Sequence, residues 1–199
     1  MVVRLSSSPS TSSGSAKRLP ASGNTALAAS ALIQAALGLE FVLSGLNKFA
    51  DPAFIVDFRA YVTASPGAHR GLFAPLVQQL VLPHIGIAAQ MTRFTELGLG
   101  LVLLAGAIEI ARRRLGGSLG KLHGYEAAVA LLSALAGAAA AGISFSIFMV
   151  NGGVFPTITP GRAFTSAIPV ELLMVPLGIA IAWLETGRFL VLRAASRRS

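Results

Sequence analysis

Four long runs of apolar residues dominate the chain, and shorter polar stretches separate them. The runs extend over residues 26–46, 85–110, 127–150 and 168–190. Each matches the roughly 20 residues that a helix needs to cross a bilayer. None alternates between apolar and polar positions, and backbone groups in hydrocarbon must pair within their own segment. The pattern predicts an all-α integral membrane protein, a four-transmembrane-helix bundle. Small residues predict its close-packed faces: Gly38, Gly45, Gly98, Ala105 and Gly137–Gly142.

The connection between the first two runs is too long for a simple turn. Asp51 and Pro52 are typical of a helix start, and apolar residues then recur at helical spacing from Phe54 to Val62. A second such pattern runs from Leu72 to Val81, before Pro83. We therefore expect two short amphipathic helices between helices 1 and 2. They either lie in the membrane interface or cover the mouth of the bundle.

Composition and charge agree with a membrane protein. The chain is 54% hydrophobic and 12% charged, with a mean hydropathy of +0.71. Most of the 16 Lys and Arg residues flank the apolar runs on the side of both termini, which predicts cytoplasmic termini in a cell membrane and no nucleic-acid partner. We expect a disordered Ser-rich tail over residues 1–25, a transmembrane domain over 26–190 and a basic tail over 191–199.

Polar and ionisable residues inside the spans are the strongest functional signal, because charge in hydrocarbon is costly. Most of them fall in the outer half of the predicted bundle. Arg93 is expected to pair either with Glu40, which is predicted at the same depth, or with Glu96. The inner half is nearly all apolar, with Gln34 its main polar residue, and Glu109, Glu126 and Glu185 are expected near the cytoplasmic surface. The predicted polar cluster consists of Glu40, Asn47, Lys48, Gln90, Arg93, Glu96, Asn151 and Glu171.

A polar pocket beneath amphipathic helices suits a ligand that enters from the lipid, and a quinone is one candidate. Residues 151–156 predict a helix end and tight turn, or alternatively backbone N–H groups offered to the ligand. A purely structural role for the charges, as pairs that hold helices together, stays open, and so does a packing role for the aromatic rings. Candidate ring contacts come from Phe41, Phe94, Phe145, Phe148 and Phe155.

Two segments resemble the DoxX family. They are residues 37–52, with Gly45 and Lys48, and residues 95–106, where Glu96 precedes a run of Gly and Leu. Val81-Leu82-Pro83-His84 is similar to the DoxD type, the membrane subunit of thiosulfate:quinone oxidoreductase. The resemblance implies a four-helix membrane protein linked to quinone-dependent redox systems, with Lys48 and Glu96 as the functional pair and candidate catalytic residues. Gln34 and Glu40 depart from the family pattern.

Three functions remain open. The first is a quinone-interacting subunit of a membrane redox complex, with a partner subunit that holds the electron-transfer cofactor, since the chain has no Cys. The second is a small proton-coupled transporter centred on Glu40, and the third is a non-catalytic assembly or anchoring protein. No metal site or covalently bound cofactor is expected, because His69, His84 and His123 are scattered.

Overall fold

The computed structural model describes residues 21–115, 124–155 and 168–197, and four long helices account for most of them. They are α1 (Ala21–Ala50), α4 (Ile85–Leu115), α5 (Glu126–Val150) and α6 (Val170–Ser196). All four are long and apolar enough to cross a membrane, which confirms the predicted bundle. Helix α1 begins before residue 26 and α6 continues past residue 190, so both predicted domain limits fall within helices. The rest of the predicted tails, 1–20 and 198–199, lies outside the described residues.

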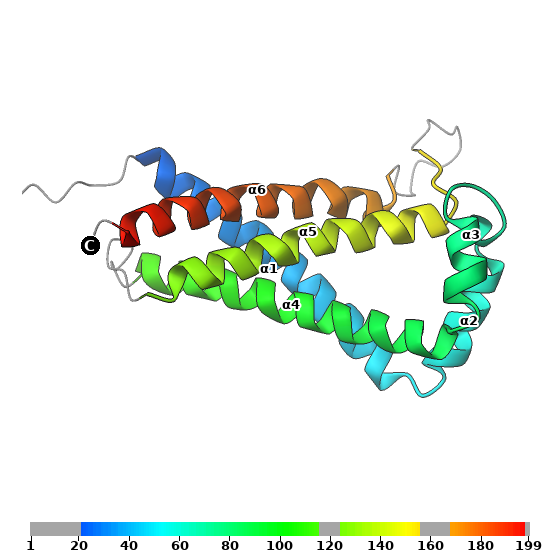
Figure 1. The fold of residues 1–199 in the computed structure, drawn as a ribbon. Coiled ribbons are helices and arrows are strands. Elements are labelled where there is room, and N and C mark those ends of the chain that lie inside the picture. The colour runs from blue at the N-terminus through cyan, green and yellow to red at the C-terminus, as the bar shows by residue number, and fades with distance from the viewer. Residues whose placement is uncertain (1–20, 116–123, 156–167, 198–199) are drawn as a thin grey trace, which may run out of the picture.

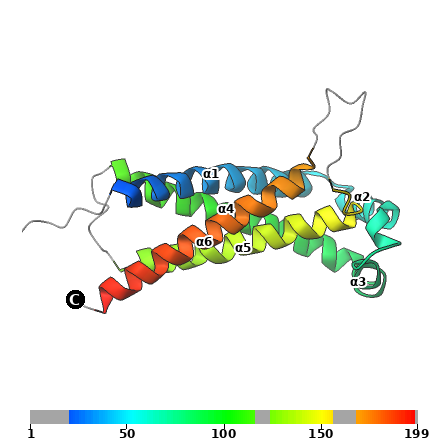
Figure 2. The ribbon, with the colours of Figure 1, turned by 90° about the horizontal axis from the view of Figure 1, so that it is seen from above.

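The bundle is made of two tightly packed helix pairs, α1 with α4 and α5 with α6 (Figure 1, Figure 2). A Cβ on Gly45 would lie 2.9 Å from the backbone nitrogen of Leu97, so the first pair touches backbone to backbone. A Cβ on Gly137 would lie 2.8 Å from the carbonyl oxygen of Gly178 in the second pair. These contacts confirm the packing role expected of Gly45 and Gly137.

Not every small residue marks a contact. Gly98 and Gly142 have open space where a Cβ would point, and Ala105 is exposed, so the packing role expected of these three is wrong. Gly38 does pack, since a Cβ there would lie 3.0 Å from the carbonyl oxygen of Gly100. A Gly or Ala allows close approach, but only the rotation of the helix decides whether a neighbour is there.

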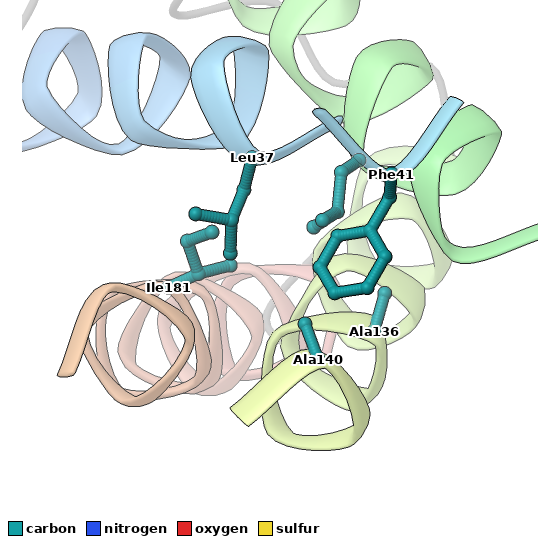
Figure 3. Close-up of a cluster of buried hydrophobic side chains, with 6 residues drawn as sticks. Leu37, Phe41, Ala136, Ala140 and Ile181 are labelled. Atoms are coloured by element: carbon teal, nitrogen blue, oxygen red, sulfur yellow. The ribbon is translucent and has the colours of Figure 1, made fainter. Parts of the chain in front are cut away.

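A small apolar core joins the two pairs. Leu37 and Phe41 of α1 point toward Ile181 of α6 and toward Ala136 and Ala140 of α5 (Figure 3). Leu103 of α4 completes this core of buried side chains. The core lies in the middle of the bundle, between two polar regions described below.

The connection from α1 to α4 folds into a compact cap over one end of the bundle. It consists of α2 (Phe54–Ala64), a 3₁₀ turn η1 (Pro66–Ala68), the short α3 (Ala74–Leu76) and a π-helical turn η2 (Val77–Val81). The two expected amphipathic segments are thus present, although the second is shorter and partly π-helical. Helix α2 begins at Phe54 with Ala53 at the cap position, while the Asp51 carboxylate accepts a hydrogen bond from the Ala53 N–H at 2.9 Å.

The cap is held by its own apolar cluster and by the end of α5. Val62, Ala68, Val77 and Ile85 are buried together, with Val150 packed against them. A Cβ on Gly67 would lie 2.7 Å from the Cα of Val150, so η1 rests directly on the α5 backbone. We call this the capped end of the bundle; the first described residues of α1 and the end of α6 lie at the opposite, terminal end (Figure 1).

Candidate functional site

A cavity of about 550 Å³ lies under the cap, between α4 and α5. The two helices diverge toward the capped end, and α2 and η2 close the space (Figure 1). Its volume falls within the range of small-molecule sites, roughly 300–1,000 Å³. Because the cap forms one wall of the cavity, the amphipathic segments act as a cover for the bundle mouth.

The walls of the cavity are mainly apolar, with a few polar groups. Phe54 and Phe58 of α2, Val77 and Val81 of η2, and Ile143 and Ile147 of α5 supply much of the apolar surface. The polar groups that line the same space are Lys48, Asp57, Tyr61, Thr92, Glu96 and Ser146. Such a site fits a largely apolar molecule with a small polar head.

The polar wall is built around a buried ion pair. Lys48 Nζ lies 2.6 Å from Glu96 Oε2, and the two side chains are 24% and 4% exposed. Ser44 completes the group: its hydroxyl donates to Glu96 Oε2 at 3.0 Å, and it accepts from Lys48 Nζ at 2.7 Å. A charge-assisted triad of this kind keeps both charges satisfied inside the bundle. The more exposed ammonium is the group best placed to meet a ligand in the cavity.

The register between α1 and α4 explains why these residues meet. Gly45 packs against Leu97, and Lys48 lies one turn further along α1, beside Glu96. The helices are antiparallel, so each step up α1 is a step down α4. Lys48 and Glu96 were predicted together, and the structure adds Ser44, one turn before Lys48 on α1, to the same contact group.

The expected pair between Glu40 and Arg93 is wrong. The same register places Arg93 beside Phe49, with the guanidinium 4.5 Å from the ring centroid. Glu40 lies nine residues further down α1, about 13 Å away along the helix axis. Its side chain is exposed and has no hydrogen bond or ion pair with any residue that the structure describes. The depth estimate failed because it assumed that both helices enter the membrane at their predicted ends.

Asn47 and Gln90 do not belong to the cavity either. Asn47 is exposed on the outer face of α1, and Gln90 lines a shallow groove with Ile55 and Met91 on the far side of α4. The candidate rings Phe41, Phe94, Phe145, Phe148 and Phe155 also lie outside the cavity lining. The three rings that line the cavity, Phe54, Phe58 and Tyr61, all come from α2 of the cap, which the sequence predicted only as an amphipathic helix.

Asn151 and Glu171 form a second polar group, which ties the cap to the long helices. Asn151 accepts a hydrogen bond from the Tyr61 hydroxyl and donates to Glu171 Oε1 at 3.3 Å. Burial raises the pKa of Tyr61 above its ordinary value of 10.0, and the nearby Glu171 carboxylate raises it further, although the hydrogen bond to Asn151 acts in the opposite direction. Tyr61 also lines the cavity, so the hydrogen bonds from Tyr61 to Asn151 and from Asn151 to Glu171 connect the cavity wall to α5 and α6.

The turn after α5 confirms the predicted helix end. Gly152 and Gly153 adopt φ values of 108° and 60°, a region that favours glycine. Their N–H groups donate to Met149 at 3.1 Å and to Phe148 at 3.0 Å. The alternative, in which these N–H groups bind a ligand, is therefore not favoured.

A third polar group, which sequence reasoning missed, lies at the terminal end. The inner half was expected to be apolar, with three glutamates near the surface, and this is wrong: Glu109, Glu126 and Glu185 are 7%, 1% and 0% exposed. Two arginines join them: Arg188 lies 3.1 Å from Glu185 and 2.5 Å from Glu109, and Arg113 lies 3.2 Å from Glu109 and 3.1 Å from Glu126. We call this group the inner network.

Polar side chains extend the inner network toward the core. Ser30 donates to Glu185 Oε1 at 2.5 Å, and the Gln34 amide nitrogen donates to the same oxygen at 3.1 Å. Ser133 is also fully buried beside Gly106, where a Cβ would clash with both its hydroxyl and the Gln34 carbonyl oxygen. Gly106 thus makes room for these two groups.

A sequence signal for the inner network did exist. Glu109 and Arg113 are four residues apart, and Glu185 and Arg188 are three apart, which is the spacing of same-face pairs on a helix. The interpretation as surface residues rested on their nearness to the helix ends. The helices stay packed against each other up to this end, where Arg113 of α4 meets Glu126 of α5 and Arg188 of α6 meets Glu109 of α4, so residues near a helix end can still be buried.

Comparison with protein-family models, with curated proteins and with solved structures finds no match to this chain.

Proposed function

We propose that this multi-pass membrane protein binds a lipid-soluble quinone in the cavity under the cap, as the membrane subunit of a redox complex. The observation that carries the proposal is the Lys48–Glu96 ion pair, 2.6 Å long, in the wall of an otherwise apolar cavity of about 550 Å³. A quinone head is a flat ring with two carbonyl acceptors on an apolar body. The cavity offers the matching chemistry: a donor ammonium, hydroxyl groups and apolar walls.

Each polar group has a distinct part in this proposal. Lys48 donates a hydrogen bond to a ligand carbonyl, and Glu96 holds the ammonium in place through the ion pair. The hydroxyls of Thr92 and Tyr61 also line the cavity; they donate to the Ala88 carbonyl oxygen and to Asn151, so toward a ligand their oxygens are acceptors. When a quinone is reduced it takes up two protons with two electrons, and Lys48, Glu96 and Asp57 are ionisable cavity groups that can carry a proton. Electrons would come from the partner subunit.

The transporter alternative has less support. Its central residue, Glu40, does not line the cavity. The apolar core of Leu37, Phe41, Leu103 and Ile181 separates the cavity from the inner network. A binding site that is closed toward the terminal end fits a ligand that enters and leaves through the lipid. The basic flanks of the helices place the cap on the outer side of the membrane in this proposal.

The experiment measures binding of radiolabelled decyl-ubiquinone to the purified protein in lipid nanodiscs. We expect saturable binding by the wild type and a Kd at least about tenfold weaker in Lys48→Met and in Glu96→Gln, because a hydrogen bond to a charged group contributes about 1.5–3 kcal/mol. The matched control is Glu185→Gln, which removes an equally buried carboxylate outside the cavity.

Folding is checked for every variant by circular dichroism and gel filtration. The proposal is overturned if the wild type does not bind, if both cavity variants bind as the wild type does, or if Glu185→Gln weakens binding as much as Glu96→Gln. Glu96→Asp tests the geometry further, since it keeps the charge but shortens the side chain that positions Lys48.

A further inference from the structure

The outer face of α1 combines a regular apolar stripe with a charge that nothing in the described structure compensates. The exposed apolar positions recur at alternating steps of four and three residues, which is the heptad spacing of helices that pack along their length. They are Leu32, Ala36, Leu39, Leu43, Leu46 and Ala50. Glu40 and Asn47, themselves seven residues apart, follow the same stripe along one edge. We call these eight residues the α1 face.

Glu40 is the informative member of the α1 face. It lies ten residues from the end of α1, about 15 Å below the capped end and near the middle of the span. Its side chain is exposed, and none of the described residues offers it a hydrogen bond or a cation. Lys48 is committed to Glu96, and Arg93 lies about 13 Å away along the axis, beside Phe49. A carboxylate in hydrocarbon without a partner is costly.

We propose that the α1 face docks a transmembrane helix of another protein, and that this helix carries an Arg or Lys at the depth of Glu40. Charge complementarity identifies the occupant. Hydrocarbon lipid tails cannot compensate a carboxylate, whereas a basic side chain on a packed neighbour does so by a charge-assisted hydrogen bond. The leucine stripe supplies the packing, and Glu40 fixes the partner's register, as a single polar residue does in a helix dimer.

A second copy of this chain does not fit the α1 face. Copies inserted in the same orientation would pack α1 on α1 about a twofold axis, which places Glu40 beside its own equivalent. Two carboxylates at close range in a medium of low dielectric constant repel each other. Asn47 would likewise meet only Asn47. The charge pattern therefore favours a different, basic partner.

The inference is independent of the ligand in the cavity, because Glu40 and Leu43 do not line it. The quinone proposal and the docking proposal can therefore be tested separately. Glu40→Gln should leave decyl-ubiquinone binding unchanged, and Glu96→Gln should leave the docking of a helix on the α1 face unchanged.

The experiment places the photoreactive amino acid p-benzoyl-phenylalanine at Leu43 of the full chain in its native membrane. Cross-linked peptides are identified by mass spectrometry. The matched control position is Leu101, which is exposed on α4 at a similar depth. We expect Leu43 to cross-link to a transmembrane peptide of another protein with Arg or Lys within one turn of the linked residue. Leu101 should give no cross-link to that peptide.

Charge exchange then tests the role of Glu40. We expect Glu40→Gln to lower the cross-link yield at Leu43 at least about threefold and Glu40→Lys to abolish it. When Glu40→Lys is combined with a partner whose basic residue is replaced by Glu, the cross-link yield at Leu43 should recover. The proposal is overturned if Leu43 links to a second copy, to a helix without a basic residue or to lipid alone, or if the two Glu40 variants cross-link as the wild type does.

Discussion

Removal of the Arg188 guanidinium tests whether the inner network holds the terminal end of the bundle together. Arg188 bridges two helices, because it donates to Glu185 on its own helix at 3.1 Å and to Glu109 on α4 at 2.5 Å. In Arg188→Met, Glu109 keeps its contact with Arg113 at 3.2 Å. Glu185 keeps only the Ser30 and Gln34 donors that the structure describes, and it is 0% exposed.

The expected cost follows from this imbalance. A buried carboxylate that loses its cation destabilises a protein by about 3–5 kcal/mol. The double variant Arg188→Met with Glu185→Gln removes both charges of the pair, and its amide can still accept from Ser30. We expect it to lose only about 1–2 kcal/mol, the value of the hydrogen bonds given up. Adding Glu185→Gln to Arg188→Met should therefore raise the free energy of unfolding above that of Arg188→Met alone.

The measurement is the free energy of unfolding in mixed micelles, from titration with sodium dodecyl sulfate followed by circular dichroism. Arg193→Met is the control, because Arg193 is an exposed arginine on the same helix, 6.0 Å from the Phe189 ring centroid. We expect it to change stability by less than about 1 kcal/mol. The reasoning is refuted if Arg188→Met costs no more than the control, or if the double variant is less stable than Arg188→Met alone.

Two further predictions concern the cap and the helix packing. Tyr61 should ionise above pH 10.0, its ordinary pKa, because burial raises its pKa; the stability it contributes is complete below pH 10.0 and is lost as pH rises through the shifted value. The measurement is a pH titration of tyrosine ionisation by absorbance at 295 nm, and Tyr61→Phe, which leaves one of the two tyrosines, identifies the contribution of Tyr61. The prediction fails if both tyrosines of the wild type ionise at or below pH 10.0. Gly178→Ala should destabilise by about 1–3 kcal/mol, since its Cβ would lie 2.6 Å from the Gly137 carbonyl oxygen, whereas Gly98→Ala, with open space, should be neutral or stabilise by up to about 1 kcal/mol. Equal unfolding free energies for the two alanine variants would show that α5 and α6 are not in backbone contact.

The architecture follows from the apolar runs of the sequence. Whether a segment can cross a membrane depends on its own length and apolar content and not on its neighbours. Four apolar runs of sufficient length therefore predict four spanning helices before any packing is known. The first helix of the cap was predictable for a similar reason, since the spacing of Phe54 to Val62 already gives one apolar helix face, but its position over the bundle mouth was left open. Lys48 and Glu96 were singled out because charge within a span is costly and because of the resemblance to a family motif.

Tertiary structure alone decided which of the polar residues meet. Glu40 and Lys48 are eight residues apart on one helix, yet one is exposed and the other is paired with Glu96 in the cavity wall. The difference depends on helix rotation and on the antiparallel register of α1 and α4, which the Gly45 contact with Leu97 sets. Register describes how two helices are aligned with each other, so the pattern of residues within one helix cannot predict it. The burial of Glu185 beside Ser30, 155 positions earlier in the chain, was invisible for the same reason.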